Sequence, residues 1–290
     1  MPELPEVETI VRDLNKAILG RKIEDVWSDF KKMIKGPKDF EQFKKEIKGK
    51  KIQKVWRRGK NIIFELSQRL SLLIHQKLTG HLLLGKWGLE KGVWRAKIPG
   101  PLAEDPMNRF LHLIFWLGNG QMLALSDLRK FAKVELLDKD TLEKELIFFG
   151  PEPLEKDFTF EKFKGCFKSK KGKIKQVLMD QTVIAGIGNI YSDEVLWEAK
   201  IHPFKEVSNL SEVELKKIYM AIKKILPLAI ELKGESFSDF RRLSGEKGYF
   251  DKARKVYRRA GEKCSRCGTI IKKGKIAGRS THFCPKCQKI

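Results

Sequence analysis

The sequence predicts an α+β protein of several domains, and three features carry the prediction. An amphipathic helical pattern opens the chain, short apolar segments broken by glycine follow to about residue 137, and two cysteine pairs stand near the end. Helical periodicity fills much of the span between residues 173 and 232. With 290 residues and 41% apolar content, the chain is long enough for two domains with cores of their own.

The first predicted element is a helix over residues 5–19. Its apolar residues recur at helical spacing and would bury one face. They are Val7, Ile10, Val11, Leu14 and Ile18. Pro5 suits the first turn and Gly20 suits the C-terminal cap.

From Ile23 to about Leu137 the pattern indicates β-strands. The clearest segments are 52–55, 62–66, 72–74, 111–117 and 122–125, which are apolar or alternating. Residues 58–61 (Arg-Gly-Lys-Asn) and 118–120 (Gly-Asn-Gly) are typical of hairpin turns. Several antiparallel strands behind one helix predict a β-sandwich.

The second half is predicted to be helical after a break at Gly150-Pro151-Glu152-Pro153. Helices are expected over 173–180, 190–199 and 212–232, the last opened by a Ser211-x-x-Glu214 capping box. Residues 185–189 (Ala-Gly-Ile-Gly-Asn) are too rich in glycine for a helix interior and predict a turn.

The cysteines predict one structural zinc ion. Cys264-x2-Cys267 and Cys284-x2-Cys287 are separated by sixteen residues, the pattern of a four-cysteine ribbon built from two hairpins. Four thiolates leave no coordination position for water, so the metal would not be catalytic. Cys166 stands apart from these pairs and is interpreted as a packed thiol.

The charge predicts a polyanionic partner. The formal net charge is +23, and residues 233–290 hold seventeen basic residues against five acidic ones. Phosphate neutralisation is the commonest use of such a surplus, so nucleic acid is favoured over a membrane surface. No apolar run reaches the roughly 18 residues of a membrane span, and no signal-peptide pattern opens the chain. We therefore expect a cytoplasmic protein.

The N-terminus carries a candidate nucleophile. Removal of Met1 would leave Pro2 with a free secondary amine beside Glu3. A terminal amine has a pKa of roughly 7.7–8.0, so part of it is unprotonated at neutral pH and can form an iminium adduct. Glu3 could move a proton and Glu6, one turn on, could orient the site. Without that chemistry, Pro2 is an ordinary helix start and both carboxylates are partners of the helix dipole.

Four stretches together resemble the formamidopyrimidine-DNA glycosylases, a family of bacterial base-excision repair enzymes. They are Met1-Pro2-Glu3-Leu4-Pro5-Glu6-Val7-Glu8-Thr9, Gly150 to Leu154, Asp180-Gln181 through Ala185 to Tyr191, and Val256-Tyr257-x-Arg259 before the cysteines. The resemblance covers nearly the whole chain in the right order. It implies a helix-two-turns-helix domain in the second half.

The resemblance also implies a bifunctional reaction on duplex DNA that contains oxidised purines or abasic sites. Pro2 would attack C1′ of the damaged nucleotide, and Glu3 would act as general acid and base. Lys60, at the tip of the first strong hairpin, would assist β-elimination. Arg279, between the cysteine pairs, matches the finger arginine implicated in δ-elimination. Without the family, Lys60 is a solvated turn lysine and Arg279 a general phosphate contact.

Other residues match the family's DNA contacts. Arg129 and Phe131 correspond to two wedges that fill the gap left by a flipped base. Leu78 stands where the third wedge is usually methionine, and core packing is its competing interpretation. Arg109 lies where the family has a Lys-His-Asp-His-like stretch and is a candidate DNA contact. Ala132 replaces the glycine that commonly follows the wedge phenylalanine.

In the second half, Lys170 and Asn189 match phosphate ligands of the family. The segment 235–241 and the tripeptide 248–250 resemble a loop that closes over a flipped oxidised purine. That loop favours this family over its relatives of the endonuclease VIII type, which prefer oxidised pyrimidines.

The resulting division of the chain has four parts. They are a catalytic β-sandwich over 1–137, a helical domain over 138–234, a lesion-capping region over 235–254 and a zinc finger over 255–290. A monomer is expected from the resemblance. Two alternatives stay open at this point: an oxidised-pyrimidine glycosylase of the same fold, and a non-catalytic zinc-ribbon protein that binds DNA.

Overall fold

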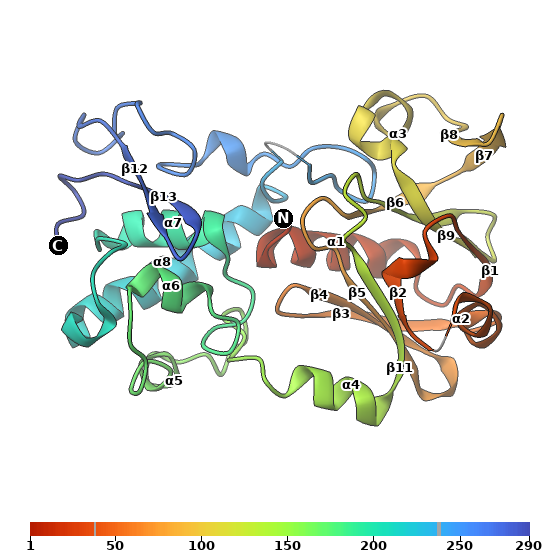
Figure 1. The fold of residues 1–290 in the computed structure, drawn as a ribbon, viewed down its shortest axis with the longest axis horizontal. Coiled ribbons are helices and arrows are strands. Elements are labelled where there is room, and N and C mark those ends of the chain that lie inside the picture. The colour runs from red at the N-terminus through yellow and green to blue at the C-terminus, as the bar shows by residue number, and fades with distance from the viewer. Residues whose placement is uncertain (38, 237–238) are drawn as a thin grey trace. The chain divides into compact units, whose positions relative to one another are not determined.

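The computed structural model describes residues 1–37, 39–236 and 239–290. These residues form two compact units, each with its own core (Figure 1). The first unit comprises Met1–Ile147 and Leu232–Asp251, and the second comprises Phe148–Glu231 and Lys252–Ile290. Within the described ranges, no helix has the length and apolar character that crossing a membrane requires.

The first unit is a β-sandwich. One sheet has the strand order β1-β9-β10-β6 and the other β2-β11-β5-β4-β3. The strands of the first sheet are β1 (Ile23–Ser28), β9 (Leu111–Leu117), β10 (Met122–Ser126) and β6 (His81–Gly85). Those of the second are β2 (Ile34–Gly36), β11 (Lys133–Asp138), β5 (Leu70–His75), β4 (Asn61–Leu66) and β3 (Ile52–Arg58). One buried apolar cluster, with members from both sheets and from the first helix, forms the core.

Both predicted hairpin turns are present. β3 pairs with β4 so that Arg58 faces Asn61, which leaves Gly59 and Lys60 as a two-residue turn. Gly59 has a φ of 57°, a value that glycine adopts without steric cost. β9 and β10 are joined by the turn at 118–120.

The leading helix α1 covers Leu4–Ala17 and buries the predicted apolar face. It ends two residues earlier than predicted, because Ile18 has a φ of −127°, outside the helical range, although its N–H still closes the last turn on the Leu14 carbonyl. Asn15 ties the helix to β3 by donating to the Val55 carbonyl at 2.6 Å and accepting from the Val55 N–H at 3.3 Å. The helix is therefore anchored on the strand that leads into the Lys60 turn.

Several elements of the first unit were not singled out from the sequence. They are α2 (Phe40–Ile47), α3 (Pro101–Glu104), α4 (Lys139–Leu146) and the separate hairpin of β7 (Trp87–Glu90) with β8 (Val93–Ala96). α2 interrupts the predicted strand region because Phe40, Phe43 and Ile47 recur at helical spacing and are buried in the core.

The second unit is helical. Its helices are α5 (Phe160–Gly165), α6 (Ile174–Met179), α7 (Asn189–Ala199) and α8 (Glu212–Glu231). The Ser211–Glu214 capping box is present, since the Ser211 N–H donates to the Glu214 carboxylate at 2.9 Å and Ser211 Oγ accepts from the Glu214 N–H at 3.3 Å. Gly150 approaches Val183 so closely that a Cβ would lie 2.4 Å from that residue's carbonyl atoms.

The C-terminal ribbon has the two predicted hairpins, of unequal length. β12 (Lys272–Ile276) pairs with β13 (Arg279–Phe283), whereas the first hairpin has a single antiparallel bridge between Lys263 and Ile270. Beside that bridge the Cys264 N–H donates to the Thr269 carbonyl at 2.9 Å, and the Cys267 and Gly268 N–H groups close the turn on the Cys264 carbonyl.

Candidate DNA-repair active site and its DNA contacts

The N-terminal end of α1 is buried and polar. Pro2 is buried, and the side chains of Glu3 and Glu6 are each 1% exposed, whereas Met1 is 40% exposed. The Glu6 carboxylate accepts from the Glu3 N–H at 2.7 Å and from the Glu235 N–H at 2.8 Å. Glu6 therefore joins the helix start to the chain segment that begins the predicted capping region.

Lys60 is buried to 7% exposure, which is unusual for a lysine in a two-residue turn. The turn is held to α1 through Arg57, whose guanidinium donates to the Glu8 carboxylate at 3.0 Å and to the Gly59 carbonyl at 3.0 Å. Burial raises the pKa of Glu8, but bonds from Arg12 and Arg57 outweigh it, so the pKa lies below its usual value. The solvated-lysine interpretation of Lys60 is wrong.

His75 lies beside this turn, as the strand partner of Asn61 and of Lys133. Its Nδ1 accepts from the Lys77 N–H at 2.9 Å. Burial, with the nearby charges of Lys77 and Lys60, lowers the pKa of His75 to about 3. The imidazole is neutral at physiological pH and carries its proton on Nε2.

The predicted wedge residues lie on two turns that share hydrogen bonds. Leu78 is half-buried in the turn after β5, whereas Arg129 and Phe131 are exposed in the turn after β10. The Arg129 guanidinium lies 4.8 Å from the Phe131 ring centroid. Thr79 joins the turns, because its hydroxyl donates to Asp127 and accepts from the Arg129 N–H at 3.1 Å. Core packing does not account for the two exposed side chains.

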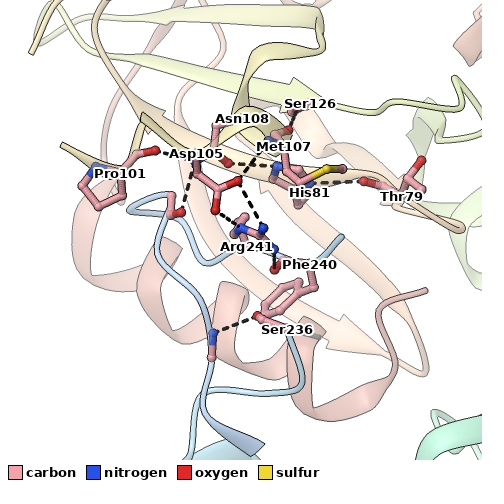
Figure 2. A network of polar contacts seen from close by, with 12 residues as sticks. Thr79, His81, Pro101, Asp105, Met107, Asn108, Ser126, Ser236, Phe240 and Arg241 are labelled. Carbon is pink, nitrogen blue, oxygen red and sulfur yellow. Dashed lines mark hydrogen bonds and ion pairs between the residues drawn. The ribbon is translucent and has the colours of Figure 1, made fainter. Parts of the chain in front are cut away.

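Arg109 is exposed at the end of the 3-10 turn Pro106–Arg109, while its neighbour Asn108 is 1% exposed. Asn108, and not Arg109, takes part in the buried polar network of Figure 2. Sequence reasoning singled out the exposed arginine and missed the buried amide, because nothing in the local pattern indicates what Asn108 contacts.

In the second unit, Asn189 is the first residue of α7 and is half-buried, and its Oδ1 atom has no hydrogen-bond partner among the described residues. Gln181 holds the preceding turn by donating to the Ile187 carbonyl at 2.8 Å and accepting from the Gly186 N–H at 2.8 Å. Lys170 lies 3.9 Å from the Asp180 carboxylate, at the outer limit of an ion pair.

Arg279 is exposed next to the tip of the β12–β13 hairpin, where Ala277 and Gly278 form the turn with positive φ angles. A buried cluster holds the hairpin. Lys175 Nζ lies 2.7 Å from the Asp193 carboxylate and donates to the Ser280 carbonyl at 2.7 Å. Asp193 also accepts from the His282 N–H at 2.9 Å. Sequence reasoning took Lys175 only as one of a run of lysines that could bind phosphate and did not find its buried role; the others in the run are exposed or half-buried.

The four predicted zinc ligands are brought together. The Sγ atoms of Cys264, Cys267, Cys284 and Cys287 all lie within 4.8 Å of one another. Four sulfurs about 2.3 Å from a tetrahedral zinc would be separated by about 3.8 Å, so the cluster fits one ion. Trp197 Nε1 donates to Cys264 Sγ at 3.5 Å, and the Arg266 guanidinium stacks 3.8 Å from the Trp197 ring centroid.

Comparison with known proteins identifies the family. The model of the formamidopyrimidine-DNA glycosylase N-terminal domain matches residues 1–134, the H2TH domain model of that family matches 149–241, and the model of the zinc finger found in FPG and IleRS matches 261–290. The formamidopyrimidine-DNA glycosylase of Pelotomaculum thermopropionicum is 40% identical over 292 residues, covering 100% of both chains. The chain belongs to the formamidopyrimidine-DNA glycosylase family.

Other members of the family agree with this assignment. The formamidopyrimidine-DNA glycosylase of Streptococcus pneumoniae is 38% identical over 291 residues, covering 100% of this chain and 99% of that one. The solved complex of Lactococcus lactis Fpg with DNA containing an abasic site has a TM-score of 0.87 at 39% identity, covering 99% of this chain and 100% of that one. A complex of MutM with carbocyclic 8-oxo-G containing DNA has a TM-score of 0.86 at 40% identity, covering 100% of both chains. The predicted fold class and the single structural zinc are thereby confirmed.

Proposed function

We propose that this chain excises oxidised purines, chiefly 8-oxoguanine and formamidopyrimidines, from duplex DNA and then cleaves the strand at the abasic site. The observation that carries the proposal is full-length membership of the family together with the buried Pro2-Glu3 start of α1. The relatives' structures contain Fapy-dG, carbocyclic 8-oxo-G or an abasic site in DNA.

In the proposed mechanism, Met1 is removed and the Pro2 amine forms a bond to C1′ as the bond from C1′ to the base breaks. The base departs with a proton, and opening of the sugar ring leaves an iminium between Pro2 and C1′. Glu3, held at the helix start, moves the protons. Glu6 sets the position of the Glu3 backbone through its 2.7 Å bond.

Strand cleavage follows by β- and δ-elimination. Lys60 assists the first elimination from the turn that Arg57 fixes against α1, and Arg279 assists the second. A lysine held in a nearly buried turn is positioned before DNA arrives, which lowers the entropic cost of engaging a phosphate. The zinc ion, when bound, supplies no catalytic chemistry. It holds the ribbon that carries Arg279.

DNA contacts are proposed for Leu78, Arg129 and Phe131 as wedges, for Arg109 as a backbone contact, and for Lys170 and Asn189 as phosphate ligands. The exposed Arg129–Phe131 pair and the place of Asn189 as the first residue of α7 support these roles. The region 235–254 is proposed to cap the lesion. Its residues 237 and 238 lie outside the described ranges.

We further propose a monomer that acts in the bacterial cytoplasm on nucleoid DNA. The support is the family resemblance and the surplus of positive charge, which attracts DNA without requiring a second subunit.

The test is borohydride trapping on a duplex with 8-oxoguanine opposite cytosine, comparing wild type with Pro2→Gly. A covalent adduct in wild type alone supports both the reaction class and the nucleophile. An adduct only on a thymine-glycol duplex would favour the pyrimidine-specific alternative. Binding without any adduct, from zinc-loaded protein of the mass expected after Met1 removal, would favour a non-catalytic DNA-binding protein.

A further inference from the structure

Four side chains of the first unit form a polar network that the proposed mechanism does not use. His81 begins β6, Asp105 precedes the turn Pro106–Arg109, and Asn108 lies within that turn (Figure 2). Arg241 belongs to the last described range, 239–290. His81 is fully buried, and Asn108 and Arg241 are 1% and 4% exposed. Side chains this polar are buried only where their bonding capacity is used.

Asn108 is the centre of the network. Its Nδ2 atom donates to the Pro101 carbonyl at 2.8 Å and to the Gly245 carbonyl at 3.1 Å. Two carbonyl acceptors fix the amide orientation, so Oδ1 faces His81 Nε2, which lies 3.1 Å away. A Cβ on Gly245 would lie 2.7 Å from Nδ2, and only glycine permits this approach.

Arg241 holds the same segment from its other end. Its Nε and Nη2 atoms donate to the two carboxylate oxygens of Asp105 at 2.6 and 3.1 Å, and Nη1 donates to the Phe240 carbonyl at 2.8 Å. The Leu84 N–H donates to the Leu243 carbonyl at 2.9 Å, which ties the middle of the segment to β6. Residues 240–245 are therefore docked at three points.

The network continues to the two turns that carry the proposed wedge residues, Leu78 in one turn and Arg129 and Phe131 in the other, which we call the wedge turns. His81 Nδ1 lies 3.2 Å from the carbonyl oxygen of Thr79, the residue after Leu78. Thr79 in turn bonds Asp127, whose carboxylate accepts from the Ala132 N–H at 2.8 Å. A neutral imidazole that donates its Nε2–H to Asn108 Oδ1 has no second proton, so the Nδ1 contact is packing and not a hydrogen bond. The bond that links the two sides is from Ser126 Oγ to the Met107 carbonyl at 2.7 Å, which joins the Asp105–Asn108 turn to the residue before Asp127.

We infer that Asn108 and the Asp105–Arg241 pair are positioning residues, which hold the two wedge turns in the geometry needed for base excision. The inference rests on the proposed wedge role of Leu78, Arg129 and Phe131. A wedge that is misplaced by a fraction of an ångström no longer fills the space of the expelled base. A site that already lacks its base is flipped at lower cost and depends less on the wedges.

The experiment compares two substrates under single-turnover conditions: a duplex with 8-oxoguanine opposite cytosine, and the same duplex with a preformed abasic site. Asn108→Ala and Arg241→Met are each expected to slow 8-oxoguanine excision by about tenfold to 100-fold. Cleavage of the abasic duplex should stay within about threefold of wild type. Arg241→Lys keeps the charge but loses the two-point geometry, so its excision rate should fall between those of Arg241→Met and wild type.

Arg95→Met is the control. It removes the same charge from β8, where the Arg95 side chain is 66% exposed and its Nε lies 3.6 Å from the Glu90 carboxylate, and both substrates should react at the wild-type rate. Equal losses on both substrates, or an equal loss in the control, would overturn the inference. So would wild-type excision in Arg241→Lys and Asn108→Ala proteins that melt at the wild-type temperature. Wild-type protein that cleaves abasic DNA but never excises 8-oxoguanine would instead contradict the proposed function.

Discussion

At the scale of single residues, burial decides what a polar side chain can do. Lys60 and Lys175 are indistinguishable from surface lysines in the sequence, yet one is 7% exposed and the other fully buried. Lys175 is held by neighbours that compensate its loss of hydration, which is the condition for keeping a charge inside a protein. Its partners, Asp193 and the Ser280 carbonyl, come from elsewhere in the chain.

His81 makes the stability depend on pH. Burial lowers its pKa to about 4, although the Thr79 carbonyl and Asn108 Oδ1 favour a proton on the ring. The unfolded chain takes up that proton below a pH of about 6.5, whereas the folded protein stays neutral down to about 4. The free energy of unfolding should therefore fall on acidification through this window, by at most about 1.4 kcal/mol per pH unit from this group.

The measurement is urea unfolding of wild type and His81→Gln between pH 7 and pH 5. The remaining histidines also contribute, so the informative quantity is the difference in slope between the two proteins. As the pH falls, the free energy of unfolding of His81→Gln should decrease less steeply than that of wild type. The difference in slope should be at most about 1.4 kcal/mol per pH unit, the contribution of one bound proton. Identical slopes would show that His81 does not titrate in this way.

At the scale of elements, the β12–β13 hairpin is attached to the helices by charge. Lys175→Met leaves the Asp193 carboxylate buried without its lysine partner, and removal of one member of a buried pair costs about 3–5 kcal/mol. Thermal unfolding should show a marked loss for Lys175→Met and almost none for the exposed Lys217→Met. The double variant Lys175→Met with Asp193→Leu should recover part of the loss, and a double variant worse than the single one would contradict this explanation.

At the scale of the whole molecule, the net charge of +23 predicts steep salt dependence of DNA binding. Each phosphate contact made by a cationic side chain contributes about −0.9 to the slope of log K against log salt. Arg279→Ala should reduce the magnitude of that slope by about 1 on both lesion-containing and undamaged duplexes. Lys45→Ala, which removes an exposed charge from α2, is the control. An unchanged slope in Arg279→Ala would remove the finger arginine from the set of phosphate contacts.

The sequence by itself determined the features that depend on local pattern. Alternation and glycine turns identified the β3–β4 and β9–β10 hairpins, 3.6-residue periodicity identified α1 and α8, and cysteine spacing identified the zinc cluster. These predictions are correct because each feature depends on residues that are close to one another along the chain. The end of α1 was predicted wrongly, because Ile18 leaves the helical range and the Gly20 N–H bonds the Ile52 carbonyl, a distant contact that the local pattern does not indicate.

Only the tertiary structure decided which polar groups are buried and what they contact. The bonds Arg57–Glu8, Lys175–Asp193, Asp105–Arg241 and Asn108–Gly245 join residues separated by 18 to 137 positions along the chain. Local periodicity carries no information about such pairs. These pairs are kept because a polar group that is buried in a low-dielectric interior without its partner lowers the free energy of unfolding. The local pattern therefore identified candidate chemistry at Pro2 and the cysteines, and the fold supplied the polar network that we propose positions the turns of Leu78, Arg129 and Phe131.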